Sequence, residues 1–498
     1  MGASTVVVGG GTAGAALAAR LVEAGDEVLL LEAGPDYGHR SESRWPGPLL
    51  DALRLPLSHD WGYDSGDTYS DRTVRFGRAR VIGGCSAHNG CAAIWGSRLD
   101  YDGWRDLGNE GWGTDDLLPY FRRASQQLRV RIFGPEEMTP FHGGFIDAAA
   151  AVGIPRVADL NDVDEDEGVG ANPANIDDGV RWNTSIAYLD RVRGRRGLTV
   201  LGDALVDRVA LEGGRCRGVS IALRGETRLV GADRVVLAGG TYGSPAVLQR
   251  SGIGDPGDLA RAGIRTVHEL PGVGRNLHDH PSIYLVLEGT AELRAQTDAF
   301  ARQHWAPDEQ AIAKVRSSRC ERGFDLHVFT YCTSDPEGVG GWRWVLQVAC
   351  LTPRSRGHLR VTGPDPEASP VIDHRYLSDP EGEDLRVLVD GLRTARRIAA
   401  HPDYAILLGG ERTPGAGVQS QEQMEAYAGA TCEHYFHPVG TCKMAPASDP
   451  GAVVDSRAAV HGIESLHVAD CSIMPVVPRA NTNIPAAVVG ERVAALLS

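Results

Sequence analysis

The chain begins with two short apolar runs that are separated by a glycine-rich segment and an alanine-rich stretch. Residues 5–8 (TVVV) are β-branched and apolar, which predicts a buried strand of a parallel sheet. Residues 9–14 read GGGTAG, and the run AALAARLVEAG at 15–25 predicts a helix with a glycine at its end. Residues 27–34 (EVLLLEAG) predict a second buried strand that finishes at Glu32. This order of strand, glycine-rich loop, helix and strand is typical of the first unit of a dinucleotide-binding fold.

Two later segments alternate between apolar and polar positions. They are FDLHVFTYCTS at 324–334 and WRWVLQVACL at 342–351, and this period predicts β-strands. Leu385, Leu388, Val389 and Leu392 share one face of a predicted helix. Together these segments predict an antiparallel sheet backed by helices. The segment 303–320 is polar and charged without a clear period, so we expect a mobile loop there, near the entrance of a site.

Composition places the chain among ordinary globular proteins. Its 498 residues are enough for two or more sub-domains, and 42% of them are hydrophobic and 23% charged. The formal net charge of −15 argues against a nucleic acid partner, because binding phosphates needs a basic face. No apolar run approaches the roughly 18 residues of a membrane span, and the first apolar run is a strand rather than a signal peptide. We therefore expect a cytoplasmic protein.

The nine cysteines are odd in number and include no C-x-x-C pair. Both facts argue against a zinc site or a disulfide framework, and they favour a reducing compartment. We expect no metal site.

The glycine-rich loop carries the first candidate chemistry. Within G-x-G-x-x-G, Gly9 makes the tight turn, Gly11 lets the backbone approach a pyrophosphate, and Gly14 lets the helix pack on the strand. The helix N-terminus favours the phosphate charge, and Glu32, which lies 21 residues after Gly11, can accept hydrogen bonds from ribose hydroxyls. A glycine turn without a ligand is the alternative, and the motif alone does not distinguish FAD from NAD. The candidate residues are Gly9, Gly11, Thr12, Ala13, Gly14, Glu32 and Ala33.

Five further segments carry a family resemblance. They read ARVIGGCSAHNG (79–90), VVLAGGTYGSPAVLQRSGIG (235–254), LPGVGRNLHDHP (270–281), HPVGT (437–441) and VADCSIMPVVPRANTNIP (468–485). In this order they resemble the glucose–methanol–choline (GMC) family of FAD oxidoreductases over nearly the whole chain, and GGCSAHN resembles the choline oxidase branch most. The resemblance implies FAD as the cofactor, and it implies oxidation of an alcohol to the carbonyl by hydride transfer to flavin N5.

The resemblance also implies how the chain is organised. We expect an α/β fold in which a Rossmann-like FAD-binding domain with the GxGxxG motif is joined to a second, α+β substrate domain built on an antiparallel sheet. Residues 1–150, 195–285 and 430–498 are assigned to the FAD-binding domain, which is discontinuous in sequence. Residues 150–195 and 285–430 are assigned to the substrate-binding domain.

Further cofactor residues follow from the family motifs. His88 lies where most members have an aliphatic residue, and in the choline oxidases the histidine of this turn is bonded to the 8α-methyl carbon of the flavin. The alternative is a turn histidine that hydrogen-bonds to backbone or flavin, and Cys85 is interpreted as a small filler. Val206 is expected to hold adenine through its backbone, and Asp470 to lie near the ribityl chain. The full set implied by the resemblance is Val81, Gly84, His88, Asn89, Gly90, Val206, Asp470, Asn483 and Ile484.

Two residues of the family motifs are candidates for catalysis. His437 in HPVGT matches the catalytic histidine and would take the hydroxyl proton, for which an ordinary pKa of about 6.5 is suitable. Asn481 holds the second active-site position and would hydrogen-bond to the substrate oxygen or the flavin. The alternatives are a structural role for His437, confusion of that residue with His434, and an Asn481 that caps the following helix.

The sequence defines the substrate and the electron acceptor less closely. The resemblance implies a carboxylate for the choline headgroup soon after D-H-P, but Ser282 follows Pro281 and the next acidic residue is Glu288. We therefore expect an alcohol other than choline as the substrate, and oxygen, a quinone or another protein as the electron acceptor. A homodimer is left open. The alternatives are a choline oxidase or dehydrogenase proper, a hydroxynitrile-lyase-like non-redox enzyme, and a non-catalytic binding protein.

Overall fold

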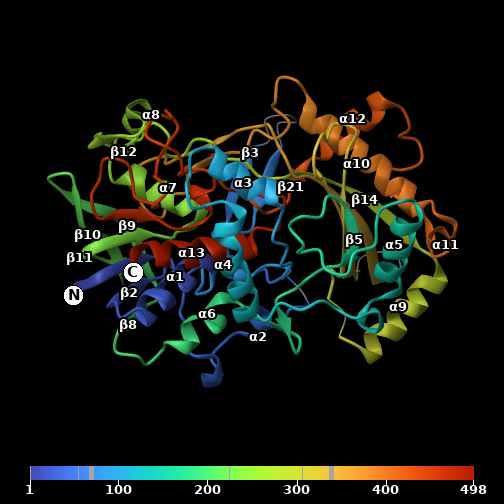
Figure 1. Ribbon diagram of the computed structural model, residues 1–498, viewed down its shortest axis with the longest axis horizontal. Helices are drawn as coiled ribbons and strands as arrows, with labels where there is room; N and C mark the ends of the chain where they lie inside the picture. The colour runs from blue at the N-terminus through green and yellow to red at the C-terminus, as the bar shows by residue number, and fades with distance from the viewer. Residues whose placement is uncertain (1, 54, 67–71, 224, 306, 336–340) are drawn as a thin grey trace.

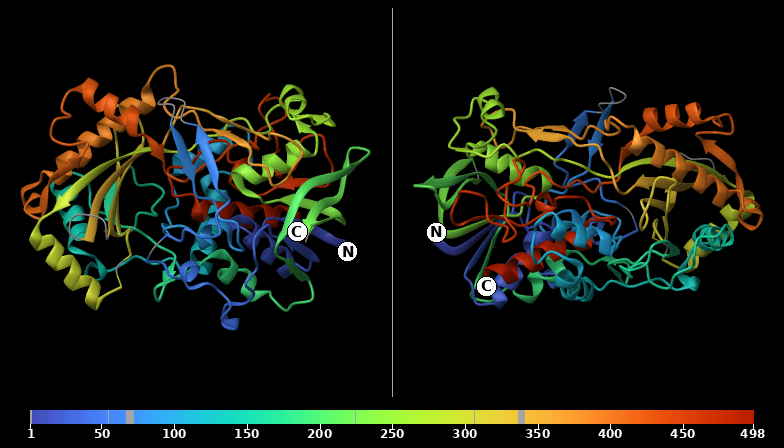
Figure 2. Two further views of the ribbon diagram at one scale, coloured as in Figure 1. Left: turned by 180° about the vertical axis from the view of Figure 1, so that it is seen from behind. Right: turned by 45° about the horizontal axis from the view of Figure 1, so that its top comes forward.

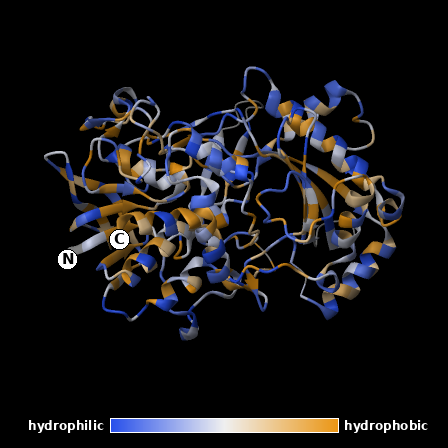
Figure 3. Ribbon diagram, in the orientation of Figure 1, coloured by the Kyte–Doolittle hydropathy of each residue, from blue (hydrophilic) through white to orange (hydrophobic). Residues whose placement is uncertain are grey.

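Two seven-stranded β-sheets lie in opposite halves of the molecule and organise its two largest hydrophobic cores (Figure 1). The computed structural model describes all residues except 1, 54, 67–71, 224, 306 and 336–340. Both chain termini lie in the half that contains the first sheet, as the views in Figure 2 also show. Apolar residues are concentrated on the strands of both halves and on the helix faces that cover them (Figure 3).

The first sheet is built from β1 Gly2–Val8, β2 Val28–Leu31, β8 Leu198–Leu201, β9 Ala204–Glu212, β10 Arg215–Leu223, β11 Glu226–Leu237 and β22 Leu466–Val468. Its strand order is β8-β2-β1-β11-β10-β9, with β22 beside β11. The pairings among β8, β2, β1, β11 and β22 are parallel, whereas β11, β10 and β9 form an antiparallel meander. All these strands lie within the segments assigned to the FAD-binding domain, and the domain boundaries themselves stay a prediction.

Helix α1 Thr12–Glu23 packs on β1, β2 and β8, and helix α13 Asn483–Leu497 packs on α1. Gly490 of α13 permits this close approach, because a Cβ there would lie 2.3 Å from the Ala13 carbonyl oxygen. The strand, helix and strand predicted at the start of the chain are confirmed as β1, α1 and β2. The helix starts at Thr12, earlier than the alanine-rich run, because the end of the glycine-rich loop already forms its first turn.

The second sheet is built from β5 Gly168–Ala171, β14 Pro281–Gly289, β15 Ala311–Val315, β16 Leu326–Asp335, β17 Gly341–Cys350, β20 Leu408–Thr413 and β21 Glu433–His434. Its order is β20-β14-β17-β16-β15-β5, with β21 beside β14, and all its pairings are antiparallel. Helix α10 Glu383–Ala399 packs on β14, β16 and β17, and helix α5 Pro140–Ala151 packs on β5, β15 and β16. Three further helices lie around this half: α9 Ala291–Gln303, α11 Pro402–Ala405 and α12 Gln421–Thr431.

The structure confirms the predicted fold class, a Rossmann-like α/β unit joined to an α+β unit on an antiparallel sheet. The two alternating segments form β16 and β17, which pair with each other from Leu326 opposite Cys350 onward. The predicted helix is α10, and it buries Leu388, Val389 and Leu392 completely.

The interpretation of residues 303–320 as a loop is wrong for part of the segment. Ala311–Val315 forms β15, which lies between β5 and β16 and is buried along its whole length. Lys314 hides the strand pattern, because a charged residue here is buried and donates a hydrogen bond to the Leu160 carbonyl oxygen. An alternation of polar and apolar residues is absent where both faces of a strand are covered.

Shorter elements complete the chain. The helices are α2 Gly47–Leu50, α3 Arg98–Asp106, α4 Thr114–Gln127, α6 Thr184–Ala187, α7 Gly240–Arg250 and α8 Pro256–Arg261. The strands are β3 Tyr63–Gly66, β4 Thr73–Phe76, β18 His358–Arg360 and β19 Val371–Asp373 in one small sheet, together with the pairs β6 Ile176–Asp177 with β7 Val180–Arg181 and β12 Ile253–Gly254 with β13 His268–Glu269. Within the described part of the chain, no helix combines the length and apolar character needed to cross a bilayer.

Candidate active site

A cavity of about 730 Å³ lies where the two halves of the molecule meet. Its walls include the carboxyl ends of β1, β2 and β11 on one side and Tyr331 of β16 on the other. Ligands of open α/β sheets bind at the carboxyl ends of parallel strands. Fifteen of the eighteen predicted site residues line this one cavity: Gly9, Gly11, Thr12, Ala13, Glu32, Ala33, Gly84, His88, Asn89, Gly90, Val206, His437, Asp470, Asn481 and Asn483. The other three, Gly14, Val81 and Ile484, are buried and do not line it.

Two glycines of the glycine-rich loop, Gly9 and Gly14, have no room for a side chain. Gly9 has a φ of 103°, and a Cβ there would lie 2.4 Å from the Ala238 carbonyl oxygen. A Cβ on Gly14 would lie 2.0 Å from the carbonyl oxygen of Gly9, so this glycine lets α1 start directly on the loop. Helix α1 has no side-chain cap, and its first residues line the cavity. Its free N–H groups and positive end therefore suit a phosphate.

Glu32 ties the loop to the end of β2. Its Oε2 accepts a hydrogen bond from Gly10 N at 2.8 Å, and its Oε1 accepts one from Gly34 N at 2.8 Å. Burial raises the pKa of the carboxyl group, while the two N–H donors favour its charged form. The carboxylate therefore has both a structural role in the loop and free acceptor positions toward the cavity.

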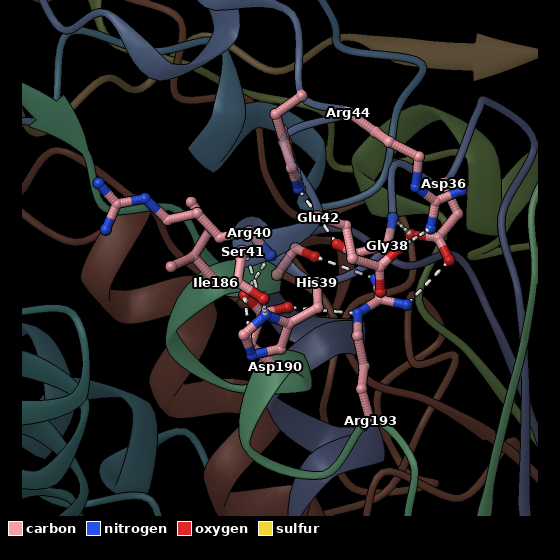
Figure 4. Close-up of polar contacts among 12 residues, drawn as sticks. Asp36, Gly38, His39, Arg40, Ser41, Glu42, Arg44, Ile186, Asp190 and Arg193 are labelled. Carbon is pink, nitrogen blue, oxygen red and sulfur yellow. Dashed lines mark hydrogen bonds and ion pairs between the residues drawn. The ribbon is translucent and has the colours of Figure 1, made fainter.

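The segment after Gly34 is anchored to the stretch that follows α6. Arg193 donates hydrogen bonds to both carboxylate oxygens of Asp36, at 2.9 and 2.6 Å, and Arg40 N donates to Asp190 at 2.9 Å (Figure 4). These contacts fix the chain just beyond Glu32, so that the cavity wall is held in place at this end.

The turn at residues 83–90 packs on the glycine-rich loop. Gly83 N donates to the Gly10 carbonyl oxygen at 2.7 Å. Gly84 has a φ of 53°, and a Cβ there would lie 2.6 Å from the Cα of Gly11. The close approach of two backbone segments therefore requires a glycine at position 84.

His88 closes this turn and lines the cavity. Its Nε2 lies 2.8 Å from the Ser58 carbonyl oxygen, so Nε2 donates and Nδ1 carries the lone pair. Burial lowers the pKa of the imidazole, which favours the neutral ring. The structure thus shows the hydrogen bond to backbone that was weighed as the alternative to a bond with the flavin.

Two further predicted cofactor residues, Val206 and Asp470, line the cavity. Val206 of β9 lines it, and the Val206 carbonyl oxygen accepts a hydrogen bond from Arg250 at 3.3 Å. Asp470 accepts from Gly240 N at 2.9 Å and from the Ser472 backbone N–H at 2.8 Å, which holds the start of α7 against the carboxylate.

Asn481 and Asn483 lie at the start of α13 and line the cavity. The helix N-cap is Thr482, without a side-chain cap, so Asn481 is not the helix cap. The Oδ1 atoms of both asparagines are buried and have no hydrogen-bond partner among the described residues. Nδ2 of Asn483 donates to Asn175 Oδ1 at 2.9 Å. Both amides therefore have unused hydrogen-bonding capacity at the cavity wall.

His437 is held by two contacts and is 8% exposed. Its backbone N–H donates to Asp279 Oδ1 at 2.8 Å, and its ring Nδ1 lies 3.1 Å from Nδ1 of His280. Burial, together with the neighbouring His280 and the cationic Arg78, holds the pKa of His437 well below the usual range. The imidazole is therefore neutral and can accept a proton.

His434 faces a different surrounding. Its Nε2 hydrogen-bonds to the Arg75 carbonyl oxygen at 3.1 Å, and its ring packs on the Phe76 ring with the two ring centroids 4.7 Å apart. It does not line the cavity. The geometry therefore separates the two histidines of this motif.

The contact between His437 and His280 requires one proton between two ring nitrogens. Burial lowers the pKa of His280 to about 3, so both rings are neutral and only one of the two Nδ1 atoms carries a proton. We assign that proton to His437, so that its Nδ1–H donates to Nδ1 of His280. In this tautomer, Nε2 of His437 carries the free lone pair that a base needs.

Sequence reasoning assigned no role to several residues at this site. Asp279 and His280 were part of a recognised motif, and their place beside His437 could have been suspected from it. Arg78 donates to the Phe436 carbonyl oxygen at 2.9 Å and lines the cavity. Glu309 lines the cavity from a segment that was interpreted as a loop, and no pattern pointed to it. Asp279, His280 and His437 each have an atom that could bind a metal ion, and these three atoms lie within 4.8 Å of one another. The hydrogen bonds of these residues to each other and to the backbone account for this clustering.

Comparison with known proteins gives a consistent result. The two parts of the GMC oxidoreductase family model match residues 3–282 and 353–490. The chain is 34% identical to oxygen-dependent choline dehydrogenase 1 of Chromohalobacter salexigens, over 98% of this chain and 93% of that one. The crystal structure of a pyridoxine 4-oxidase from Mesorbium loti superimposes with a TM-score of 0.88 at 29% identity, over 99% of this chain and 98% of that one. An FAD-dependent oxidoreductase from Chaetomium thermophilum superimposes with a TM-score of 0.85 at 26% identity, over 99% of each chain.

Proposed function

We propose that this chain, which belongs to the GMC oxidoreductase family and is an FAD-dependent oxidoreductase, oxidises an alcohol to the carbonyl with His437 as the base. The observation that carries the proposal is the neutral, cavity-lining imidazole of His437, whose Nδ1 is engaged by His280 and whose Nε2 is left free. An imidazole that is neutral at neutral pH has a nitrogen lone pair that can take the hydroxyl proton of an alcohol.

The residues of the cavity fit FAD. The glycine-rich loop and the turn at 83–90 form a cradle that side chains would fill, and the start of α1 suits the pyrophosphate. Glu32 offers acceptor positions for ribose hydroxyls, and Asn481 and Asn483 offer unpartnered amide oxygens for the far end of the cofactor. When bound, the flavin supplies the acceptor for the hydride that leaves the alcohol carbon.

The protein's own residues would act on the alcohol in a defined order. Asn481 orients the hydroxyl group through a hydrogen bond. His437 Nε2 receives the hydroxyl proton, and the Nδ1–H of His437 remains bonded to His280. The position of Asp279 fixes the backbone of His437, so that the base keeps its direction.

His88 is proposed to carry the covalent bond to the flavin. The neutral ring at the end of the turn supports the proposal, because a neutral imidazole nitrogen is a nucleophile. The bond would form through Nδ1, which carries the lone pair while Nε2 keeps its hydrogen bond to the Ser58 carbonyl oxygen. The flavin methyl carbon would lose a proton as this bond forms, and the flavin would take up the electron pair and pass it to the electron acceptor.

Choline is proposed to be a poor substrate, and the chain offers one argument for this and one against. Ser282 is fully buried, donates to the His434 carbonyl oxygen at 3.0 Å and does not line the cavity, so this position supplies no charge for an ammonium group. The names of the 34% identical relatives favour the alternative, that the chain is itself a choline dehydrogenase.

The experiment is an anaerobic screen of alcohols with the FAD-loaded protein, read as bleaching of the flavin absorption. We expect bleaching by one or more alcohols and slow bleaching by choline at submillimolar concentration, because no charge at Ser282 pairs with its ammonium group. Efficient bleaching by choline would make this a choline enzyme. Failure of every alcohol would favour a non-redox enzyme on the same fold. Oxygen consumption with the best alcohol then tests oxygen as the acceptor, which the relatives' name "oxygen-dependent" favours.

A further inference from the structure

One carboxyl group of the cavity has no part in the reaction described above. Glu309 lies between α9 and β15, and its side chain lines the cavity together with Gly90, Tyr331 and Tyr435. A Cβ placed on Gly90 would lie 2.3 Å from Oε1 of Glu309 and 2.5 Å from Oε2. The carboxylate is therefore packed directly on the turn that ends the cofactor cradle.

This carboxylate has no hydrogen-bond or ion-pair partner among the residues that the structure describes. The cation that acts on it is Arg181, which is fully buried and donates to the carbonyl oxygens of Asn89 at 2.9 Å and Asp51 at 3.2 Å. Burial raises the pKa of Glu309 to about 8, the neighbouring Asp308 adds to this rise, and Arg181 opposes it. The side chain is half-buried and faces the cavity, so a cation bound there would stabilise the ionised carboxylate that burial disfavours.

The surroundings of Glu309 suit a cation. Tyr331 and Tyr435 also line the cavity. Burial, and then the charge of Glu309, raises the pKa of both phenol groups, so both rings stay neutral. Aromatic rings next to a carboxylate are a favourable environment for an ammonium group. The Tyr435 ring also contacts the His437 ring, with centroids 4.8 Å apart. Glu309 and the proposed base are therefore both neighbours of one tyrosine.

We propose that Glu309 binds a protonated amine of the substrate, so that the alcohol oxidised by this protein is a short amino alcohol that keeps at least one N–H. This inference rests on the proposed function, because it names the substrate class of the same site. An ammonium group with an N–H supplies the charge and the hydrogen bond that Glu309 lacks. A quaternary ammonium group supplies the charge alone, which agrees with choline as the poorer substrate.

The test measures binding without turnover. The probes are N,N-dimethylethylamine, a cation with an N–H and no hydroxyl group, and ethyltrimethylammonium, a cation of similar size without an N–H. Calorimetry with the FAD-loaded protein at pH 8 compares the wild type with Glu309→Gln, which removes the charge and keeps the shape. Glu381→Gln is the matched control, because Glu381 is exposed and pairs with Arg354 on the surface.

We expect the first probe to bind the wild type and Glu381→Gln equally and Glu309→Gln at least about tenfold more weakly. The second probe should bind the wild type more weakly than the first. Equal affinity of the first probe for the wild type and Glu309→Gln, or no binding to the wild type, would overturn the inference. The flavin spectrum checks that the variant is folded, and if Glu309→Gln loses FAD, Glu309→Asp is the variant to compare and should also weaken binding.

The same probes keep this inference separate from the proposed function. Bleaching of the wild-type flavin by a neutral alcohol such as 3,3-dimethyl-1-butanol as fast as by N,N-dimethylethanolamine would retain alcohol oxidation and contradict the role of Glu309. Amine binding that depends on Glu309, in a protein whose flavin no alcohol bleaches, would retain the amine site and contradict the oxidation.

Discussion

At the scale of single residues, the state of His437 is set by its neighbours rather than by its type. Its backbone N–H is hydrogen-bonded to Asp279, and its ring Nδ1 is hydrogen-bonded to Nδ1 of His280. The carboxylate of Asp279 is itself buried and accepts from the Tyr376 hydroxyl group at 3.0 Å, and burial raises its pKa to about 6. The proposed base therefore depends on a chain of contacts that runs through Asp279 and His280.

Replacing His280 tests this dependence. His280→Ala removes the acceptor for Nδ1–H of His437, and the tautomer with a free Nε2 loses its support. We expect the rate constant of flavin reduction to fall by about 10- to 100-fold, while the substrate concentration for half-saturation changes little. His280→Asn, whose side-chain oxygen can accept the same hydrogen bond, should recover part of the rate.

The pH profile distinguishes positioning from simple loss of packing. Because the pKa of His437 is lowered, its imidazole stays neutral below pH 6.5. The rate of flavin reduction by the wild type should therefore stay constant as the pH falls through 6.5 and should decrease only at lower pH. His280→Ala should change this acid limb, and a wild-type rate and profile in His280→Ala would show that His280 has no such role. Anaerobic stopped-flow measurements of flavin reduction at a series of pH values give both the rate constant and its pH profile.

At the scale of elements, the site depends on two backbone segments that touch. The turn at 83–90 and the glycine-rich loop at 9–14 meet with no room for a Cβ on Gly84. This contact places His88 at the cavity wall, held by the hydrogen bond to Ser58. The turn is therefore part of the proposed cofactor cradle, and it also holds the His88 ring in place.

The covalent bond proposed for His88 belongs to this turn. Protein precipitated with acid or denatured in SDS should keep its yellow colour and flavin fluorescence, and His88→Asn should release all its FAD on the same treatment. Cys85→Ser is the control and should keep the flavin bound, because Cys85 is interpreted as a filler of the same turn. Recovery of all wild-type flavin in the acid supernatant would show that His88 is only a neighbour of the cofactor.

At the scale of the whole molecule, the two sheets meet at the cavity and supply different parts of the site. The first sheet and α1 form the cradle. β14 starts directly after His280, β21 ends three residues before His437, and β16 provides Tyr331. The proposed base and its partner His280 are separated by 157 residues in the chain. They are brought together by the pairing of β21 with β14 and by the backbone bridge between His278 and Val439.

Local patterns were sufficient for the parts of the fold that the chain forms locally. The β1-α1-β2 unit follows from its apolar runs and glycines, and β16 and β17 follow from their alternation. β15 could not be found in this way, because its covered faces and buried Lys314 remove the period. Glu309 could not be found from the sequence either, because its role depends on a cavity that forms only in the tertiary structure, next to the turn at Gly90. The pairing of His280 with His437 likewise required the tertiary structure.

The central claim is that His437 is the base, and replacing it is the most direct test. The rate of anaerobic flavin reduction by the best alcohol is measured for the wild type, His437→Ala and His434→Ala, each checked for bound FAD by its absorption spectrum. We predict that His437→Ala binds FAD and loses about 100- to 10,000-fold of the reduction rate, because the hydroxyl proton has no acceptor. His434→Ala should lose far less, since His434 does not line the cavity. A larger loss in His434→Ala than in His437→Ala, or a wild-type rate in His437→Ala, would contradict the account.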